Sequence, residues 1–72
     1  MKGGDPVFNG QQVRALRLQK RLSQVALAQA TGVTAPYISF LESGQRGTRP
    51  SYPFVLRLAR ALDVDPGAFL AG

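Results

Sequence analysis

The side chains of this sequence best suited to chemistry are its nine lysines and arginines, which can bind phosphate groups. They outnumber four carboxylates and give the chain a formal net charge of +5 at pH 7. Residues 1–22 carry five of the nine against Asp5 alone, and residues 45–60 carry the other four, whereas residues 23–44 carry only Glu42. A basic excess of this kind is typical of nucleic-acid-binding proteins, although many other small proteins share it.

Several kinds of chemistry are excluded by what the sequence lacks. It has no cysteine and no histidine, which removes disulfides, thiolate metal sites and the usual general base near neutral pH. The carboxylates do not pair at catalytic spacing, and there is no phosphate-binding loop. The longest apolar runs are four residues long, too short for a membrane span. We therefore expect a single small cytoplasmic domain that is not an enzyme, takes no metal or cofactor and does not bind membranes.

The elements that must position the basic side chains are short helices, each preceded by a residue that can cap a helix N-terminus. These capping residues are Asn9, Ser23, Thr34, Ser51 and Asp65. The pattern predicts an all-α fold of five short helices, the second ending near Thr31 and the fourth near Leu62. Residues 1–7, which are rich in glycine and proline, are expected to form a loose N-terminal arm, and residues 8–72 a single domain.

The apolar residues of these segments define a candidate core. The apolar stripe of the fourth segment consists of Tyr52, Val55, Leu56, Ala59 and Leu62, which recur at helical spacing. Four large apolar residues fall outside the inward faces and are expected to be exposed: Leu18, Val25, Phe40 and Phe54. The predicted core comprises Val13, Leu16, Leu22, Leu27, Ala28, Val33, Ile38, Leu41, Val55, Leu56, Ala59, Leu62, Val64 and Phe69.

Residues 24–43, QVALAQATGVTAPYISFLES, are the most informative stretch. Ala28 is small enough for a second helix to approach closely, and Gly32 can adopt the positive φ that turns the chain sharply. The inward apolar positions of the two helices are Leu27, Val33, Ile38 and Leu41. The small, glycine and apolar positions together indicate a helix-turn-helix, in which residues 34–43 form the candidate recognition helix.

This motif lies within a longer resemblance to the Cro/repressor (XRE-like) helix-turn-helix family of bacteria and phages. The resemblance rests on Val13-Arg14-Ala15-Leu16-Arg17, Leu22-Ser23-Gln24, Leu27-Ala28, Gly32-Val33, Tyr37-Ile38-Ser39, Leu41-Glu42-Ser43-Gly44, Pro50-Ser51 and Leu58-Ala59-Arg60-Ala61-Leu62. It covers residues 8–71 and implies a five-helix lambda-repressor-like DNA-binding domain. It also implies a DNA-bound transcriptional regulator, usually dimeric, working at the bacterial nucleoid or in a phage-infected cell.

The resemblance also implies roles for individual residues. The residues expected to face the DNA major groove are Thr34, Ala35, Pro36, Tyr37 and Phe40. The family pattern supports a phosphate contact from Gln24. Phosphate contacts are also expected from Ser39, and from Arg46 and Arg49 because they lie in the loop behind the recognition helix. Arg17 and Glu42 match positions where an arginine of the first helix pairs with a carboxylate of the recognition helix, so we expect a structural ion pair there. The dimer interface is expected in the C-terminal region, at Pro66, Phe69 and Leu70.

Three side chains of the recognition helix keep two interpretations each. Phe40 either packs against the second helix or the following loop, or contacts thymine methyl groups in the major groove. Tyr37 either packs into the domain or reaches a base or phosphate with its hydroxyl, and Ser39 is either a surface hydroxyl or a phosphate donor.

The sequence also departs from the family pattern in three places. The recognition helix has no Arg, Lys, Asn or Gln, and the loop after Gly44 is longer than usual. Arg21 stands where the family usually has glycine. If the backbone is left-handed at Arg21, a residue other than glycine costs roughly 1–2 kcal/mol.

These features predict a sequence-specific DNA-binding transcriptional regulator. It would bind a pseudo-palindromic operator in double-stranded DNA as a homodimer. Repression is the expected outcome, and a controller-type activator of similar size is the other possibility. The alternative is a protein-interaction module, or an antitoxin that combines both roles, because exposed apolar side chains and the absence of polar base readers also suit a partner protein.

Overall fold

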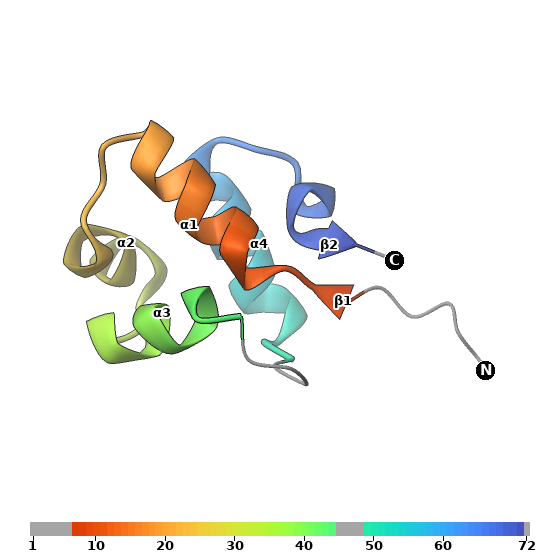
Figure 1. Ribbon diagram of the computed structural model, residues 1–72, viewed down its shortest axis with the longest axis horizontal. Coiled ribbons are helices and arrows are strands. Elements are labelled where there is room, and N and C mark those ends of the chain that lie inside the picture. The colour runs from red at the N-terminus through yellow and green to blue at the C-terminus, as the bar shows by residue number, and fades with distance from the viewer. Residues whose placement is uncertain (1–6, 45–48, 72) are drawn as a thin grey trace.

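The computed structural model describes residues 7–44 and 49–71 of the 72-residue chain. Its helices are α1 (Gly10–Gln19), α2 (Gln24–Thr31), α3 (Ala35–Glu42) and α4 (Tyr52–Leu62), followed by a 3₁₀ helix, η1 (Pro66–Phe69). Two short strands, β1 (Val7–Phe8) and β2 (Leu70–Ala71), precede α1 and follow η1. Figure 1 shows α3 along the lower edge of the molecule, with both strands at one end.

The helices begin at the residues that the sequence indicated. Each of the five capping side chains accepts a hydrogen bond from a backbone N–H in the first turn: Asn9 from Gln12, Ser23 from Ala26, Thr34 from Tyr37, Ser51 from Phe54, and Asp65 from Gly67. These bonds satisfy N–H groups that have no partner within the helix. Because capping depends on neighbouring residues alone, the helix starts were predictable from the sequence.

The prediction of five α-helices needs correction, because the described residues contain four. The segment after Asp65 forms only a four-residue 3₁₀ turn, after which Leu70 is extended. Strand β2 then pairs antiparallel with β1, with Phe8 opposite Leu70, and the rings of Phe8 and Phe69 lie 6.2 Å apart. The segment forms this short 3₁₀ helix rather than an α-helix because the chain then extends at once to pair with β1. Residues 1–6 of the predicted arm lie outside the described residues, and Val7 belongs to β1.

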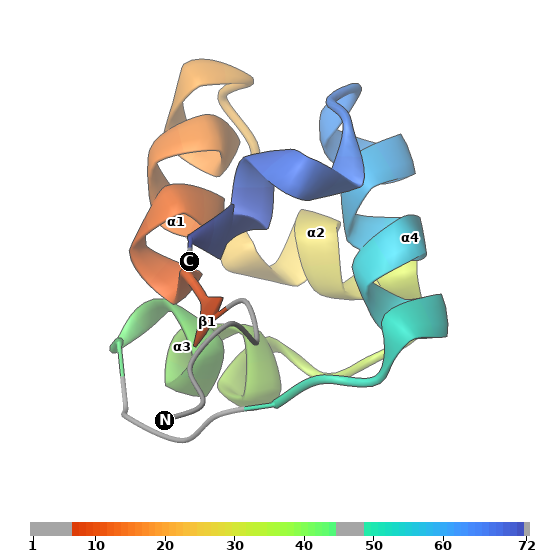
Figure 2. The same cartoon turned by 90° about the vertical axis from the view of Figure 1, so that its right-hand side faces the viewer.

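The core lies between α1, α2, α3 and α4, and the C-terminal segment covers it. Figure 2 shows this segment crossing between α1 and α4, in agreement with the contacts of η1 to both helices. The buried apolar residues are Val13, Leu27, Ala28, Ile38, Leu41, Phe54, Val55, Leu58, Ala59, Leu62 and Phe69. Most of the predicted core is therefore present, with the half-buried Leu16, Leu22, Val33 and Val64 packed against it.

Helix α4 is rotated relative to the prediction. Phe54, expected to be exposed, is only 4% exposed, and Leu58 is fully buried. Leu56, assigned to the core, is 40% exposed, and Tyr52 of the predicted stripe is also exposed. Apolar residues occur on both sides of Val55, so helical spacing alone allowed two orientations. Packing against α2 and η1 selects the one that buries the phenylalanine.

No helix in residues 7–44 and 49–71 is long and apolar enough to cross a membrane.

Candidate nucleic-acid interface

Helices α2 and α3 form the helix-turn-helix that the sequence indicated. Gly32 ends α2 with φ 77°, in the left-handed region, and the N–H of Val33 donates to the carbonyl of Ala28 across 3.0 Å. Ala28 is buried where the helices meet, and the cap at Thr34 starts α3 two residues after Gly32. Ile38 and Leu41 turn into the core, which fixes the opposite side of α3 as its outer surface.

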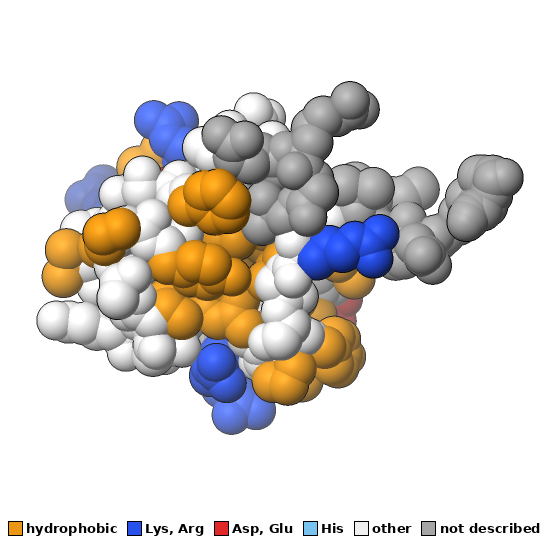
Figure 3. Space-filling view, turned by 90° about the horizontal axis from the view of Figure 1, so that it is seen from below, with side chains coloured by type: hydrophobic (Ala, Val, Ile, Leu, Met, Phe, Trp, Pro, Cys, Tyr) orange, Lys and Arg blue, Asp and Glu red, His pale blue; other side chains and the backbone are white. Residues whose placement is uncertain are grey.

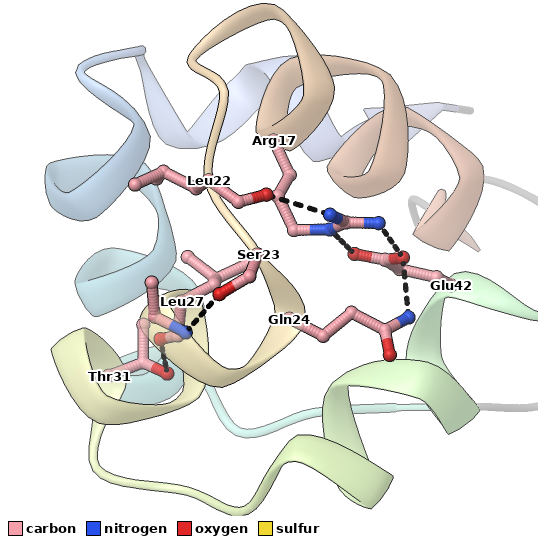
Figure 4. Close-up of polar contacts among 8 residues, drawn as sticks. Arg17, Leu22, Ser23, Gln24, Leu27, Thr31 and Glu42 are labelled. Carbon is pink, nitrogen blue, oxygen red and sulfur yellow. Dashed lines mark hydrogen bonds and ion pairs between the residues drawn. The ribbon is translucent and has the colours of Figure 1, made fainter.

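The C-terminal end of α3 is joined to α1 by a buried ion pair (Figure 4). Arg17 Nε donates to Glu42 Oε2 across 2.7 Å, and Arg17 Nη2 donates to Glu42 Oε1 across 3.0 Å. Arg17 Nη1 donates to the carbonyl of Leu22 across 2.8 Å, so one guanidinium also holds the turn between α1 and α2. The hydrogen bonds to Glu42 raise the pKa of Arg17 above its ordinary value, against the opposing effect of burial. The guanidinium is charged and its donors are used within the fold, as expected for the structural ion pair.

Gln24, a predicted phosphate contact, is also part of this network. Its side-chain nitrogen donates to Glu42 Oε1 across 3.1 Å, and the side chain is half-buried at the start of α2. An amide nitrogen carries two hydrogens, so this bond uses one donor and leaves the other. The contact orients the Gln24 amide at the N-terminus of α2.

Gly10 provides a second connection between α1 and α3 that sequence analysis missed. A Cβ at Gly10 would overlap the carbonyl oxygen of Leu41, so the start of α1 lies directly against the backbone of α3. Only glycine permits this approach. No local pattern marks the position, because the contact joins segments 31 residues apart.

The outer surface of α3 carries apolar and hydroxyl side chains and no charged one. Figure 3 shows the face that carries α3, where hydrophobic side chains gather at the centre and Lys and Arg side chains lie at the margins. Pro36, Ser39 and Phe40 are exposed, Phe40 to 48%. Ala35 and Tyr37 are half-buried, and the exposed Thr34 uses its hydroxyl oxygen as the cap. All five predicted groove residues thus lie on or beside one surface.

Tyr37 packs into the domain on one side. Its ring meets the ring of Phe54 edge-on, with centroids 5.5 Å apart. Phe40 extends from the outer surface, as expected from its position off the buried side of α3. Val25, also exposed as expected, lies near the start of α2.

The basic residues divide into structural and exposed groups. Arg57 Nε donates to the carbonyl of Thr31 across 3.0 Å, and its guanidinium carbon lies 5.9 Å from the Phe54 ring centroid. It therefore caps the C-terminus of α2, a role that the sequence did not reveal. Arg49 is exposed just before α4. Arg46, another predicted phosphate contact, lies outside the described residues.

The predicted dimer interface needs one correction. Phe69 has no exposed surface, because it fills the core beneath the C-terminal segment, so it cannot contact a second copy. Pro66 is half-buried and Leu70 is exposed. Pro66 lines a groove between α4 and the following segment, together with Leu56, Ala59, Arg60, Asp63, Val64 and Asp65.

Comparisons with known proteins agree with this arrangement. A helix-turn-helix domain family matches residues 10–70. The HTH-type transcriptional repressor RghR of Bacillus subtilis is 42% identical over 55 residues, which are 76% of this chain. The matched part spans 40% of the length of RghR.

Two solved structures share the fold. The restriction-modification controller protein C.AhdI of Aeromonas hydrophila is 42% identical, with a TM-score of 0.74 over 83% of this chain and 88% of that one. The P22 c2 repressor protein, solved in complex with a synthetic operator, is 33% identical, with a TM-score of 0.76 over 85% of this chain and 89% of that one. With these matches, and with the helix-turn-helix and its buried ion pair in place, the chain belongs to the XRE/Cro-type helix-turn-helix family.

Proposed function

We propose that this domain binds double-stranded DNA sequence-specifically and regulates transcription, with repression as the main outcome. The observation that carries the proposal is the outer surface of α3, which is exposed while the rest of the helix is firmly held. A recognition helix must project from its domain in a fixed orientation to enter the major groove. The repressor RghR and the operator complex of the P22 c2 repressor support this function.

Phosphate contacts would come from groups around α3. The first turns of α2 and α3 contain no acidic residue, so their N–H groups and helix dipoles can attract phosphates. Gln24 would use its second amide hydrogen, Ser39 is exposed on α3, and Arg49 is exposed just before α4. Arg46 belongs to the same proposal on sequence grounds alone.

A homodimer on a pseudo-palindromic site would use the groove between α4 and the following segment. Leu56 and Pro66 give this groove apolar surface, with Arg60 on α4 and the acidic Asp63 and Asp65 after it. In a two-fold dimer each surface meets its own copy, so Arg60 of one subunit can face the carboxylates of the other. The two recognition helices would then need a separation of about 34–36 Å to enter successive major grooves.

The salt dependence of binding tests the DNA proposal. If three to four basic groups per subunit meet phosphates, a dimer neutralises about six to eight, and the slope of log K against log[salt] is about −5 to −7. Duplexes selected from a random-sequence library would be titrated with the protein at several salt concentrations. Arg49→Ala should make the slope less steep by roughly 2 per dimer, because each subunit loses one phosphate contact. Binding that does not change with salt would refute the proposal.

Sedimentation tests the dimer separately. Leu56→Glu places a charge in the groove and should shift the protein toward the monomer. Leu18→Glu is the matched control, because Leu18 is also an exposed leucine, on α1 and outside the groove. A wild-type protein that stays monomeric at all concentrations, with and without DNA, would contradict the dimer.

A protein-interaction role, including that of an antitoxin, is the second candidate. The observation that favours it is the exposure of large apolar side chains on α2 and α3, Val25 to 55% and Phe40 to 48%. A partner protein would contact them through apolar side chains, and its binding would vary little with salt. The titration above therefore separates the two candidates.

A further inference from the structure

The outer surface of α3 offers few groups that can read bases by hydrogen bonding. Its outward positions form one stripe at helical spacing, consisting of Pro36, Ser39, Phe40 and Ser43. The hydroxyl of Ser43 already donates to the carbonyl of Phe40 across 2.6 Å, and the hydroxyl oxygen of Thr34 accepts from the N–H of Tyr37. Serine and threonine hydroxyls both donate and accept, so they discriminate weakly between bases.

The apolar part of this surface can recognise one feature of the major groove. Base edges there present donors, acceptors and the 5-methyl group of thymine. That methyl group is the apolar element in the pattern, and Phe40 and Pro36 are the exposed apolar side chains of α3. A cytosine methylated at C5 presents a methyl group at the same ring position, while retaining the donor of an ordinary cytosine.

We propose that α3 reads pyrimidine 5-methyl groups, mainly through Phe40, so that affinity depends on thymine and on the C5 methylation of cytosine in the site. This inference rests on the proposed DNA-binding function. The occupant is double-stranded DNA rather than an apolar protein, because the surface has Lys and Arg at its margins (Figure 3). The acidic residue of α3, Glu42, is turned inward and paired with Arg17.

The test compares duplexes that differ only in methyl groups. In a duplex selected by the wild-type protein, one groove-facing thymine per half-site is replaced by uracil, 5-methylcytosine or cytosine, with the matching purine opposite. The protein should bind the uracil duplex about two- to fivefold more weakly than the thymine duplex for each methyl group lost. It should bind the cytosine duplex more weakly than the 5-methylcytosine duplex by a similar factor. Each comparison keeps the hydrogen-bonding pattern constant, so the methyl group is the only change.

Variants locate the effect on the protein. Phe40→Ala should remove most of the difference within each pair of duplexes while leaving the salt slope unchanged. A methyl effect that acts only through DNA stiffness would persist in Phe40→Ala. Phe40→Leu, which keeps an apolar side chain, should retain part of the difference. Leu18→Ala is the control, because Leu18 lies on α1. This variant should bind every duplex with the same affinity as the wild-type protein.

The outcomes distinguish failure of this inference from failure of the proposed function. Suppose that binding depends on salt, but that the affinity is the same for uracil and thymine duplexes and the same for cytosine and 5-methylcytosine duplexes. This result overturns the reading of methyl groups and leaves the proposed DNA binding intact. Selected sites without thymine at the groove-facing positions would also overturn the reading of methyl groups. A protein that selects no duplex, or binds without salt dependence, refutes the proposed function itself.

Discussion

The two ends of α3 are held by different kinds of contact. At the C-terminal end, Glu42 accepts two hydrogen bonds from Arg17, and the backbone at Leu41 lies against Gly10. At the N-terminal end, Tyr37 meets Phe54 of α4 through its ring edge. The C-terminal end is thus fixed by directional polar bonds to α1, and the N-terminal end by aromatic packing against α4.

This difference separates the residues that orient α3 from those that are exposed on it. A buried ion pair fails abruptly when one partner is removed, since the other charge is then left uncompensated. Aromatic packing loses strength in smaller steps as surface is removed. Neither end uses the outer surface, so substitutions there are free to change binding without changing the fold. The predictions below test this division.

Arg17→Ala should have the largest effect on stability. Loss of one partner of a buried ion pair costs about 3–5 kcal/mol, a large part of what a domain of this size has. For so small a domain this lowers Tm by more than about 12 °C. Thermal unfolding of Arg17→Ala, Arg49→Ala and Arg14→Ala would measure it.

The two comparison variants sharpen this test. Arg49→Ala should keep its Tm and weaken DNA binding, whereas Arg17→Ala should affect the affinity of the folded protein far less than its stability. Arg14 is exposed on the same helix as Arg17, so Arg14→Ala should change stability by less than about 0.5 kcal/mol. An unchanged Tm in Arg17→Ala would mean that the ion pair does not hold α3.

Gly10→Ala tests the backbone contact at the same end of α3. Alanine in a helix is favoured over glycine by about 0.5–1 kcal/mol, but overpacking typically costs about 1–3 kcal/mol. The cost of overpacking should exceed the gain in helix propensity, because the new methyl group would meet the backbone carbonyl oxygen of Leu41 rather than a flexible side chain. Denaturant unfolding should show a net loss of about 1–2 kcal/mol. Gln11→Ala, at the exposed neighbouring position, should have little effect, and a stabilised Gly10→Ala would show that α1 can move away from α3.

The sequence predicted the features of this fold that depend on neighbouring residues. Helix starts follow from capping side chains, and the turn between α2 and α3 follows from Gly32. The ion pair was expected only through the family resemblance, because Arg17 and Glu42 are 25 residues apart. The candidate groove residues were likewise assigned through the family resemblance, and their contacts with DNA stay predictions.

Features that depend on packing between distant segments were not predictable. The face of α4 was misassigned because Phe54 and Leu56 are equally apolar, and only α2 and η1 decide between them. The role of Arg57 required knowing that the carbonyl of Thr31 lies within its reach. Phe69 was assigned to both the core and the dimer interface, and its complete burial excludes the second role.

Arg57→Ala tests the connection between α4 and the turn that precedes α3. A cation at a helix C-terminus contributes about 0.3–1 kcal/mol, and its position over the Phe54 ring adds a similar amount. The loss should be about 1 kcal/mol, clearly smaller than for Arg17→Ala. Arg57→Lys should recover part of it, because lysine keeps the charge without the planar guanidinium. A loss as large as that of Arg17→Ala would mean that both ends of α3 are held equally strongly.

Arg21→Gly should have the smallest effect and the opposite sign. Helices α1, α2 and α4 end in the same way, with a left-handed residue followed by an N–H that donates back five positions, as from Leu22 to Arg17. The left-handed residues are Arg21 (φ 58°), Gly32 (φ 77°) and Asp63 (φ 57°). This position favours glycine, and the turn at Arg21 brings the carbonyl of Leu22 to the guanidinium of Arg17.

The expected gain follows from two opposing quantities. The left-handed conformation costs a residue other than glycine roughly 1–2 kcal/mol, while glycine loses about 0.5–1 kcal/mol more backbone entropy on folding. Arg21→Gly should therefore stabilise the domain by about 0.5–1 kcal/mol and raise Tm by roughly 2–8 °C. Asp63→Gly is the comparison variant and should gain less, because aspartate tolerates the left-handed region better than arginine and because the Asp63 carboxylate lies 4.0 Å from the Lys20 ammonium. If Arg21→Gly destabilises the domain, the Arg21 side chain stabilises the α1–α2 turn by more than its left-handed backbone costs. The polar contacts that hold the C-terminal end of α3 would then include residues of the α1–α2 turn beyond the Arg17–Glu42 ion pair.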